Sequence, residues 1–102
     1  MNFIDACAPE QVAPGQSLAL CIGGRDVALF NVDGGFHAIE NSCPHAGGAL
    51  SSGRLSGCVV ACPSHGLRFN VTTGAHVSSP ELAVATFPVK VAGGRVLVSL
   101  GK

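Results

Sequence analysis

The stretch VALFNVDGGFHAIEN, residues 27–41, decides the fold class of this 102-residue chain. Two apolar runs flank Asp33-Gly34-Gly35, and an Asp-Gly turn between such runs is typical of a β-hairpin. The same arrangement recurs after residues 17–22, at the turn Gly-Gly-Arg-Asp, and near the end of the chain at Gly93-Gly94. Helical periodicity is almost absent. The chain is therefore predicted to be all-β.

The remaining segments complete this prediction. Short strands are expected over residues 58–61 and 67–71, and a single helical turn is expected over residues 8–12. A stretch rich in Gly, Ser, Pro, Cys and His, about residues 42–69, interrupts the strands. We expect one domain, residues 1–102, built as an antiparallel β-sandwich or small barrel that carries this stretch as a loop-rich insertion.

Composition excludes several classes of protein. Lys plus Arg and Asp plus Glu number six each, so no electrostatic attraction to nucleic acid or to an acidic membrane surface is expected. No apolar run approaches the roughly 18 residues of a membrane-spanning helix. The N-terminal residues lack the features of a secretion signal, and the five cysteines are an odd number. We expect a cytoplasmic protein without structural disulfides.

Two short units in the insertion carry the chemistry. Cys43 and His45 form a Cys-x-His unit, Cys62 and His65 form a Cys-x-x-His unit, and sixteen residues separate His45 from Cys62. Thiolate and imidazole ligands suit zinc or iron–sulfur centres. The four side chains could hold one tetrahedral zinc ion, or the cysteines one iron and the histidines the other iron of a [2Fe–2S] cluster. Zinc fingers pair like ligands, so the mixed units favour the two-iron centre.

The pattern C-P-H-x16-C-P-x-H-G resembles the motif of Rieske proteins, and Leu50, Gly53, Phe69 and Thr73-Gly74 extend the likeness into the flanks. The hairpins on both sides resemble the Rieske fold, and length and layout are similar to the ferredoxins of bacterial ring-hydroxylating dioxygenase systems. The resemblance implies a Rieske-type [2Fe–2S] cluster with Cys43 and Cys62 on the buried iron and His45 and His65 on the outer iron.

The same resemblance implies a function. The expected role is a soluble one-electron carrier between an NAD(P)H-dependent flavin reductase and a terminal oxygenase of aromatic hydrocarbon catabolism. The protein would meet both partners only transiently. A second reading is the small Rieske subunit of an assimilatory nitrite reductase, and a third is a structural zinc module. The chain is not expected to be an enzyme, because its strongest candidate catalytic side chains are better used as ligands.

The chain departs from the cytochrome-bc type of Rieske protein at four positions. Gly48 and Ser64 replace a pair of bridging cysteines, and Leu67 and Phe69 replace two hydroxyl donors near the cluster. Hydrogen bonds to cluster sulfurs raise the reduction potential, so a low potential is expected.

Several side chains outside the two units are further functional candidates. Cys21 and Cys58 are expected to be buried apolar residues, and His37 and His76 to face solvent. Arg68, beside the second unit, is expected to be an ordinary exposed strand residue, with partner docking as the alternative.

Overall fold

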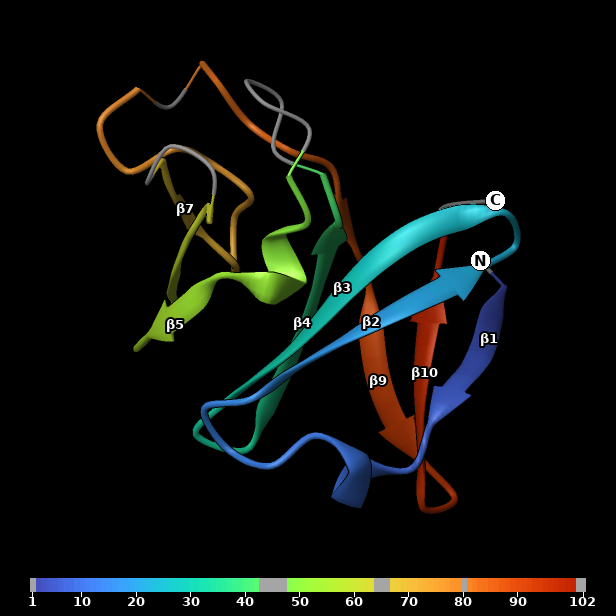
Figure 1. The fold of residues 1–102 in the computed structure, drawn as a ribbon. Helices are drawn as coiled ribbons and strands as arrows, with labels where there is room; N and C mark the ends of the chain where they lie inside the picture. Colours follow the sequence, from blue (N-terminus) through green and yellow to red (C-terminus); the bar gives the residue numbers. More distant parts are fainter. Residues whose placement is uncertain (1, 43–47, 64–66, 80, 101–102) are drawn as a thin grey trace.

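The structure is a computed structural model that describes residues 2–42, 48–63, 67–79 and 81–100. Short strands joined by tight turns dominate these residues, as the sequence predicts, together with two single-turn 3-10 helices (Figure 1). The elements are β1 (Phe3–Cys7), η1 (Pro9–Gln11), β2 (Ser17–Ile22), β3 (Arg25–Val32), β4 (Gly35–Glu40), η2 (Leu50–Ser52), β5 (Arg54–Ser56), β6 (Val59–Ala61), β7 (Arg68–Asn70), β8 (Thr86–Phe87), β9 (Val89–Ala92) and β10 (Arg95–Ser99).

The described strands form three antiparallel sheets (Figure 1). Their strand orders are β1-β10-β9, β2-β3-β4-β8 and β5-β6-β7. The third sheet belongs to the segment that the sequence marks as an insertion, so this segment has a small sheet of its own. The all-β antiparallel prediction is confirmed. Among the described residues, no helix is long and apolar enough to cross a bilayer.

The central strand β3 is buried on both faces. Val27 and Leu29 belong to a core cluster shared with β10, whereas Ala28 and Phe30 belong to a second cluster shared with the β5-β6-β7 sheet. All four side chains are 0% exposed. A strand covered on both faces reads as a continuous apolar run rather than as an alternation. This explains why residues 27–30 carry no polar side chain.

The same two-sided burial corrects the expectation for His37 in β4. Alternation places His37 opposite Phe36 and Ala38 and therefore predicts that it faces solvent. Phe36 and Ala38 do pack into the core that contains Val96, but the other face of β4 is covered as well. Ile39 on that face is 0% exposed and His37 is half-buried.

Two-residue turns set the register of the hairpins. Gly23 and Gly24 have φ values of 55° and 80°, which places both in the left-handed region used by primed hairpin turns. The strands consequently extend further than predicted. Arg25 pairs with Ile22 and Asp26 with Cys21, so Asp26 is a strand residue rather than a turn residue.

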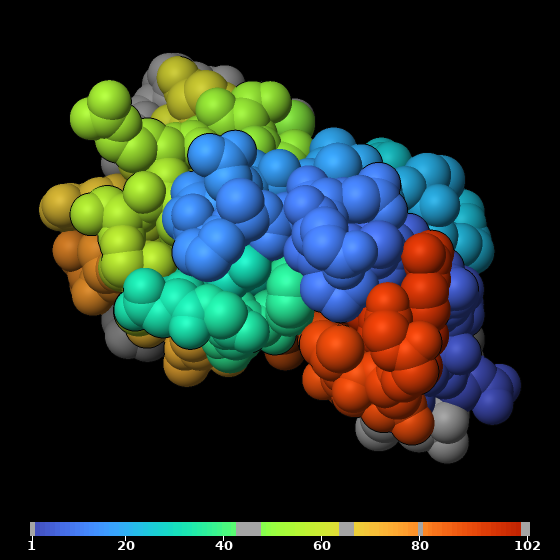
Figure 2. Space-filling model, turned by 90° about the horizontal axis from the view of Figure 1, so that it is seen from below, coloured from blue at the N-terminus to red at the C-terminus, as the bar shows by residue number. Residues whose placement is uncertain are grey.

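The Asp33-Gly34 turn of the β3–β4 hairpin is confirmed, with φ values of 50° and 91°. Asn31, one of the few buried polar residues, supports it by accepting a hydrogen bond from Gly34 N–H at 2.8 Å. This turn, η1 and the β9–β10 turn lie at one end of the molecule (Figure 2).

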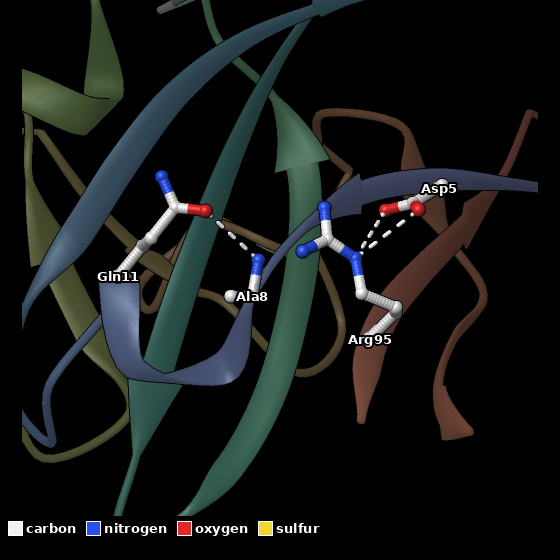
Figure 3. Close-up of polar contacts among 4 residues, drawn as sticks. All are labelled: Asp5, Ala8, Gln11 and Arg95. Carbon is white, nitrogen blue, oxygen red and sulfur yellow. Dashed lines mark hydrogen bonds and ion pairs between the residues drawn. The ribbon is translucent and has the colours of Figure 1, made fainter. Parts of the chain in front are cut away.

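Strand β1 was not predicted. It pairs with β10 at the opposite end of the chain, and the Asp5 carboxylate contacts Arg95 Nε at 3.0 and 3.1 Å (Figure 3). The helical turn that follows was predicted correctly. Gln11 caps η1 by accepting a hydrogen bond from Ala8 N–H at 2.9 Å.

Candidate metal centre

Cys62 is the predicted ligand that the structure describes, and it stands at the end of β6. Its N–H donates to the Leu67 carbonyl oxygen at 2.6 Å, which closes the base of the connection between β6 and β7. The residue is 2% exposed and belongs to the core cluster that contains Leu50 and Phe69. The thiol-bearing residue therefore sits at the boundary between the apolar core and the second loop.

The first loop is held by a side chain that the sequence analysis did not single out. Asn41 follows β4, and its Oδ1 accepts a hydrogen bond from Ser51 N–H at 2.8 Å. Ser51 in η2 is itself fixed, because its carbonyl oxygen accepts from Ser17 Oγ at 2.7 Å. Asn41 thereby ties together the chain before and after residues 43–47. The available signal was an Asn at the entry of a loop, where its amide readily bonds to nearby backbone.

Two apolar residues of the motif, which follow the two loops in the sequence, are buried in the core. Leu50 and Phe69 are both 0% exposed and share one core cluster with Cys62. Leu50 belongs to η2, directly after the first loop, and Phe69 belongs to β7, directly after the second. The chain therefore leaves both loops at a common apolar base, and it enters the second loop from the same base at Cys62. The motif combines metal ligands with the packing that supports them.

Gly53 is required by close backbone packing. A Cβ at this position would overlap the carbonyl oxygen of Ala61 and would also approach the Leu50 carbonyl oxygen at 3.2 Å. Ala61 is the residue before Cys62. The absence of a side chain at Gly53 thus lets the chain leaving the first loop lie against the strand that enters the second loop.

Gly74 has a similar role, with an added conformational requirement. Its φ is 79°, and a Cβ there would overlap the Val84 carbonyl oxygen. The Gly74 N–H donates to the Asn70 carbonyl oxygen at 2.7 Å, so the turn after β7 is closed tightly. Leu50, Gly53 and Phe69, recognised in the sequence as parts of a motif, therefore shape the base of the loops, and Gly74 shapes the turn that follows β7.

Cys43, His45 and His65 lie outside the described residues. Within the described ranges, no group of three His, Cys, Asp or Glu side chains forms a metal site. Whether these residues suit a [2Fe–2S] cluster is therefore judged from the chemistry of the four donor groups and from the burial of Cys62. Two thiols and two imidazoles are the ligand set of a Rieske [2Fe–2S] centre, and the burial of Cys62 is consistent with a thiolate-ligated iron on the protein side.

The non-motif histidine beside this base is structural. His76 packs edge-on against the Phe69 ring, with centroids 5.5 Å apart and an interplanar angle of 88°. Its Nδ1 accepts hydrogen bonds from the N–H groups of Ser78 and Ser79 at 3.0 and 3.1 Å. His76 is half-buried, so it lies at the surface with only part of its ring open to solvent. Its ring supports Phe69 and orders the following turn.

The remaining cysteines occupy three different environments. Cys21 is exposed on an outer strand, and Cys58 is partly buried in the turn before β6, so the expectation of burial is wrong for Cys21. Cys7 is buried at 2% exposure. Burial raises the pKa of the Cys7 thiol; Arg95 opposes this rise and Asp5 adds to it.

Comparison with known proteins identifies the class. The family model described as "Rieske [2Fe-2S] domain" matches residues 2–88. The chain belongs to this family, and its cofactor is a Rieske-type [2Fe–2S] cluster. This excludes the alternative that the chain is a structural zinc module.

Individual relatives are similar over nearly the whole chain. The ferredoxin component of the naphthalene 1,2-dioxygenase system of Pseudomonas aeruginosa is 36% identical over 100 residues, which cover 97% of this chain and 96% of the relative. A solved structure described as a complex of reduced oxygenase and oxidized ferredoxin in carbazole 1,9a-dioxygenase contains a chain that is 36% identical, with a TM-score of 0.86 and coverage of 95% and 92%.

A putative NADH-dependent nitrite reductase small subunit from Mycobacterium tuberculosis is also similar in structure, at 30% identity, a TM-score of 0.87 and coverage of 95% of this chain and 93% of that chain. The curated relative is named as a ferredoxin component of a dioxygenase system rather than as its catalytic component. This agrees with the prediction that the chain is an electron-transfer protein and not an enzyme.

Proposed function

We propose that this protein is a one-electron carrier that takes electrons from an NAD(P)H-dependent flavin reductase and passes them to a terminal oxygenase that hydroxylates aromatic rings. The observation that carries the proposal is the likeness to a dioxygenase ferredoxin component over 97% of this chain and 96% of that relative.

We also propose the ligand set. Cys43 and Cys62 bind the inner iron, and His45 and His65 bind the outer iron. The burial of Cys62 against Leu50 and Phe69 supports the inner position of its thiolate. Because a Rieske centre has two histidines on one iron, the other two positions complete the set. Within a single domain of residues 1–102, the segment of about 42–69 then serves as the cluster-binding part.

The described residues contribute by holding this part rigid. The cluster, when bound, accepts and releases one electron. The Asn41–Ser51 hydrogen bond keeps the first loop closed, and the Cys62–Leu67 hydrogen bond keeps the second loop closed. Leu50 and Phe69 are 0% exposed, so the base to which the two loops connect contains no side-chain surface open to water at these positions. A rigid, dry base limits the rearrangement that accompanies each change of charge. We place the protein in the cytoplasm, where a nicotinamide-dependent reductase would work.

The ligand proposal is tested by iron content and EPR of purified variants. Cys62→Ser should lose the cluster and its reduced-state EPR signal, because ligation and folding of the loops are coupled. Cys58→Ser, a matched change four residues earlier in the chain, should retain both. Cluster loss in a folded Cys58→Ser protein, or a normal signal in Cys62→Ser, would contradict the assignment.

The role is tested by reconstitution. The protein, a flavin reductase and an oxygenase encoded beside it should couple NAD(P)H oxidation to hydroxylation of an aromatic substrate, and omission of the protein should abolish product formation. The alternative role, a nitrite reductase subunit, predicts co-purification with a sirohaem subunit instead. That result, without coupled hydroxylation, would overturn the proposal.

A further inference from the structure

Charge is distributed unevenly along this neutral chain. Residues 41–80 contain two charged side chains, Arg54 and Arg68, and none of the six carboxylates. The rest of the chain has four basic and six acidic side chains. The segment that carries the cluster motif is therefore positive, although the protein has no net charge.

Strand pairing brings the two arginines together. Arg54 in β5 pairs with Ala61 in β6, and Ala61 pairs with Arg68 in β7. Residues directly opposite one another in antiparallel strands point to the same face. The two arginines thus stand on the same face, about 10 Å apart at two strand spacings, with only Ala61 between them.

This outer face contrasts with the inner face of the same sheet. Leu55, Val60 and Phe69, on the alternate positions, pack into the core. The outer positions surround a hollow with an apolar floor. That hollow is lined by Arg54, Ser56, Val59, Ala61, Arg68 and Val77.

The arginine face is open and has apolar surface beside its charges. Arg54 and Arg68 are exposed, and within the described residues neither has an ion-pair partner. Val77 is 44% exposed, although its backbone N–H is fixed by the Arg68 carbonyl oxygen at 3.0 Å. Exposed arginines beside a small apolar surface are typical of protein interfaces, in which Arg is enriched.

The face also adjoins the electron path of the proposed function. Ala61 immediately precedes Cys62 in the sequence, and Arg68 in β7 follows His65 by three residues. A partner seated on this face would approach the second cluster loop from its side. Redox partners bury little area and need only bring their centres close together.

The charge of the cluster differs between the oxidised and the reduced carrier, and this affects its attraction to each partner. A cluster of two ferric ions, two sulfides, two thiolates and two neutral imidazoles has no net charge, and reduction adds one negative charge. The arginines therefore attract an acidic surface more strongly while the protein is oxidised. The oxidised form is the one that meets the reductase, and acquisition of the electron weakens the attraction and favours release.

We propose that the outer face of β5-β6-β7, with Arg54 and Arg68 on either side of Ala61, is the docking surface for an acidic patch on the flavin reductase. This inference rests on the proposed function. It adds the partner's surface chemistry and the two residues that recognise it. Complementary charge acts mainly on the rate of encounter and on its salt dependence.

The electrostatic part is tested with inorganic oxidants of opposite charge. Dithionite-reduced protein transfers one electron to tris(oxalato)cobaltate(III), an anion, or to hexaamminecobalt(III), a cation, and cobalt(III) becomes cobalt(II). R54Q/R68Q should lower the ratio of the anion rate to the cation rate about threefold to tenfold at low salt. R25Q/K90Q removes equal charge from exposed positions on the other sheets and should leave this ratio unchanged. An unchanged ratio in R54Q/R68Q, or an equal shift in the control, would overturn the proposal.

The docking part is tested with the reductase. R54Q/R68Q should raise the KM for the protein about threefold to tenfold at low salt, with kcat unchanged, and should flatten its salt dependence. R25Q/K90Q should behave as wild type. If the ratio of the two cobalt-complex rates changes but the KM does not, the face is positive but is not a docking surface. If only electron transfer to the oxygenase is affected, the face belongs to the other partner. Either result refutes the proposal. If the unaltered protein has its EPR signal but is not reduced by the reductase, the proposed function itself fails.

Discussion

Phe69 offers the sharpest test of how the fold supports the cluster. Its ring is 0% exposed and packs in the same cluster as Leu50 and Cys62, which flank the two loops in the sequence. Phe69→Leu removes three buried carbons, which at about 0.8 kcal/mol per methylene corresponds to roughly 2 kcal/mol. If this loss of stability is confined to the cluster-binding part, the equilibrium constant for opening that part rises about 30-fold. The rate of iron release to a chelator, followed by the visible absorbance of the cluster, should rise by a similar factor.

The chain contains a matched control for this substitution. Phe87 is 7% exposed and belongs to the other core cluster, with Val96 and Val98. Phe87→Leu should lower the free energy of unfolding by a comparable amount and leave iron release close to the wild-type rate. Equal iron-release rates in the two variants, at equal losses of global stability, would show that the two cores open together and would refute the reasoning.

Four further predictions concern single features. Asn41→Ala removes the acceptor for Ser51 N–H, so it should lower stability by about 1 kcal/mol in chemical denaturation and speed cluster loss; an unchanged rate would argue against the loop clamp. Iodoacetamide should label exposed Cys21 well before Cys7. Because the pKa of Cys7 is raised in the folded protein, its protonated thiol favours folding at neutral pH. This contribution to the free energy of unfolding should be lost as pH rises above the ordinary thiol pKa toward the raised one. If the stability of Cys7→Ala has the same pH dependence as that of the wild type, this prediction is contradicted. With the apolar side chain of Phe69 in place of a hydroxyl donor, the midpoint potential should lie near the bottom of the Rieske range, about −150 mV, and a clearly positive midpoint in a redox titration would oppose this reading.

Local sequence indicated most of the strands, the turns and the metal motif, but not β1 or β5. Turn chemistry depends on the residues within the turn, so Asp33-Gly34 and Gly93-Gly94 were identified without tertiary information. The Cys and His units could also be recognised from the sequence, because ligand type and spacing are properties of short segments. The flanking Leu50 and Phe69 could be recognised as parts of a motif, but their burial in a single core was not apparent from the sequence.

Tertiary structure decided which distant segments meet. Strand β1 has little alternation of its own and exists because β10 offers it a partner at the far end of the chain. The half-burial of His37 depends on a second layer that covers β4, which no local pattern encodes. The juxtaposition of Arg54 and Arg68 requires the register of three strands, in which a slip of one residue would turn either side chain to the other face. Backbone conformation is a local property, whereas burial and charge clustering depend on register and packing between segments, so they emerge only in the folded chain.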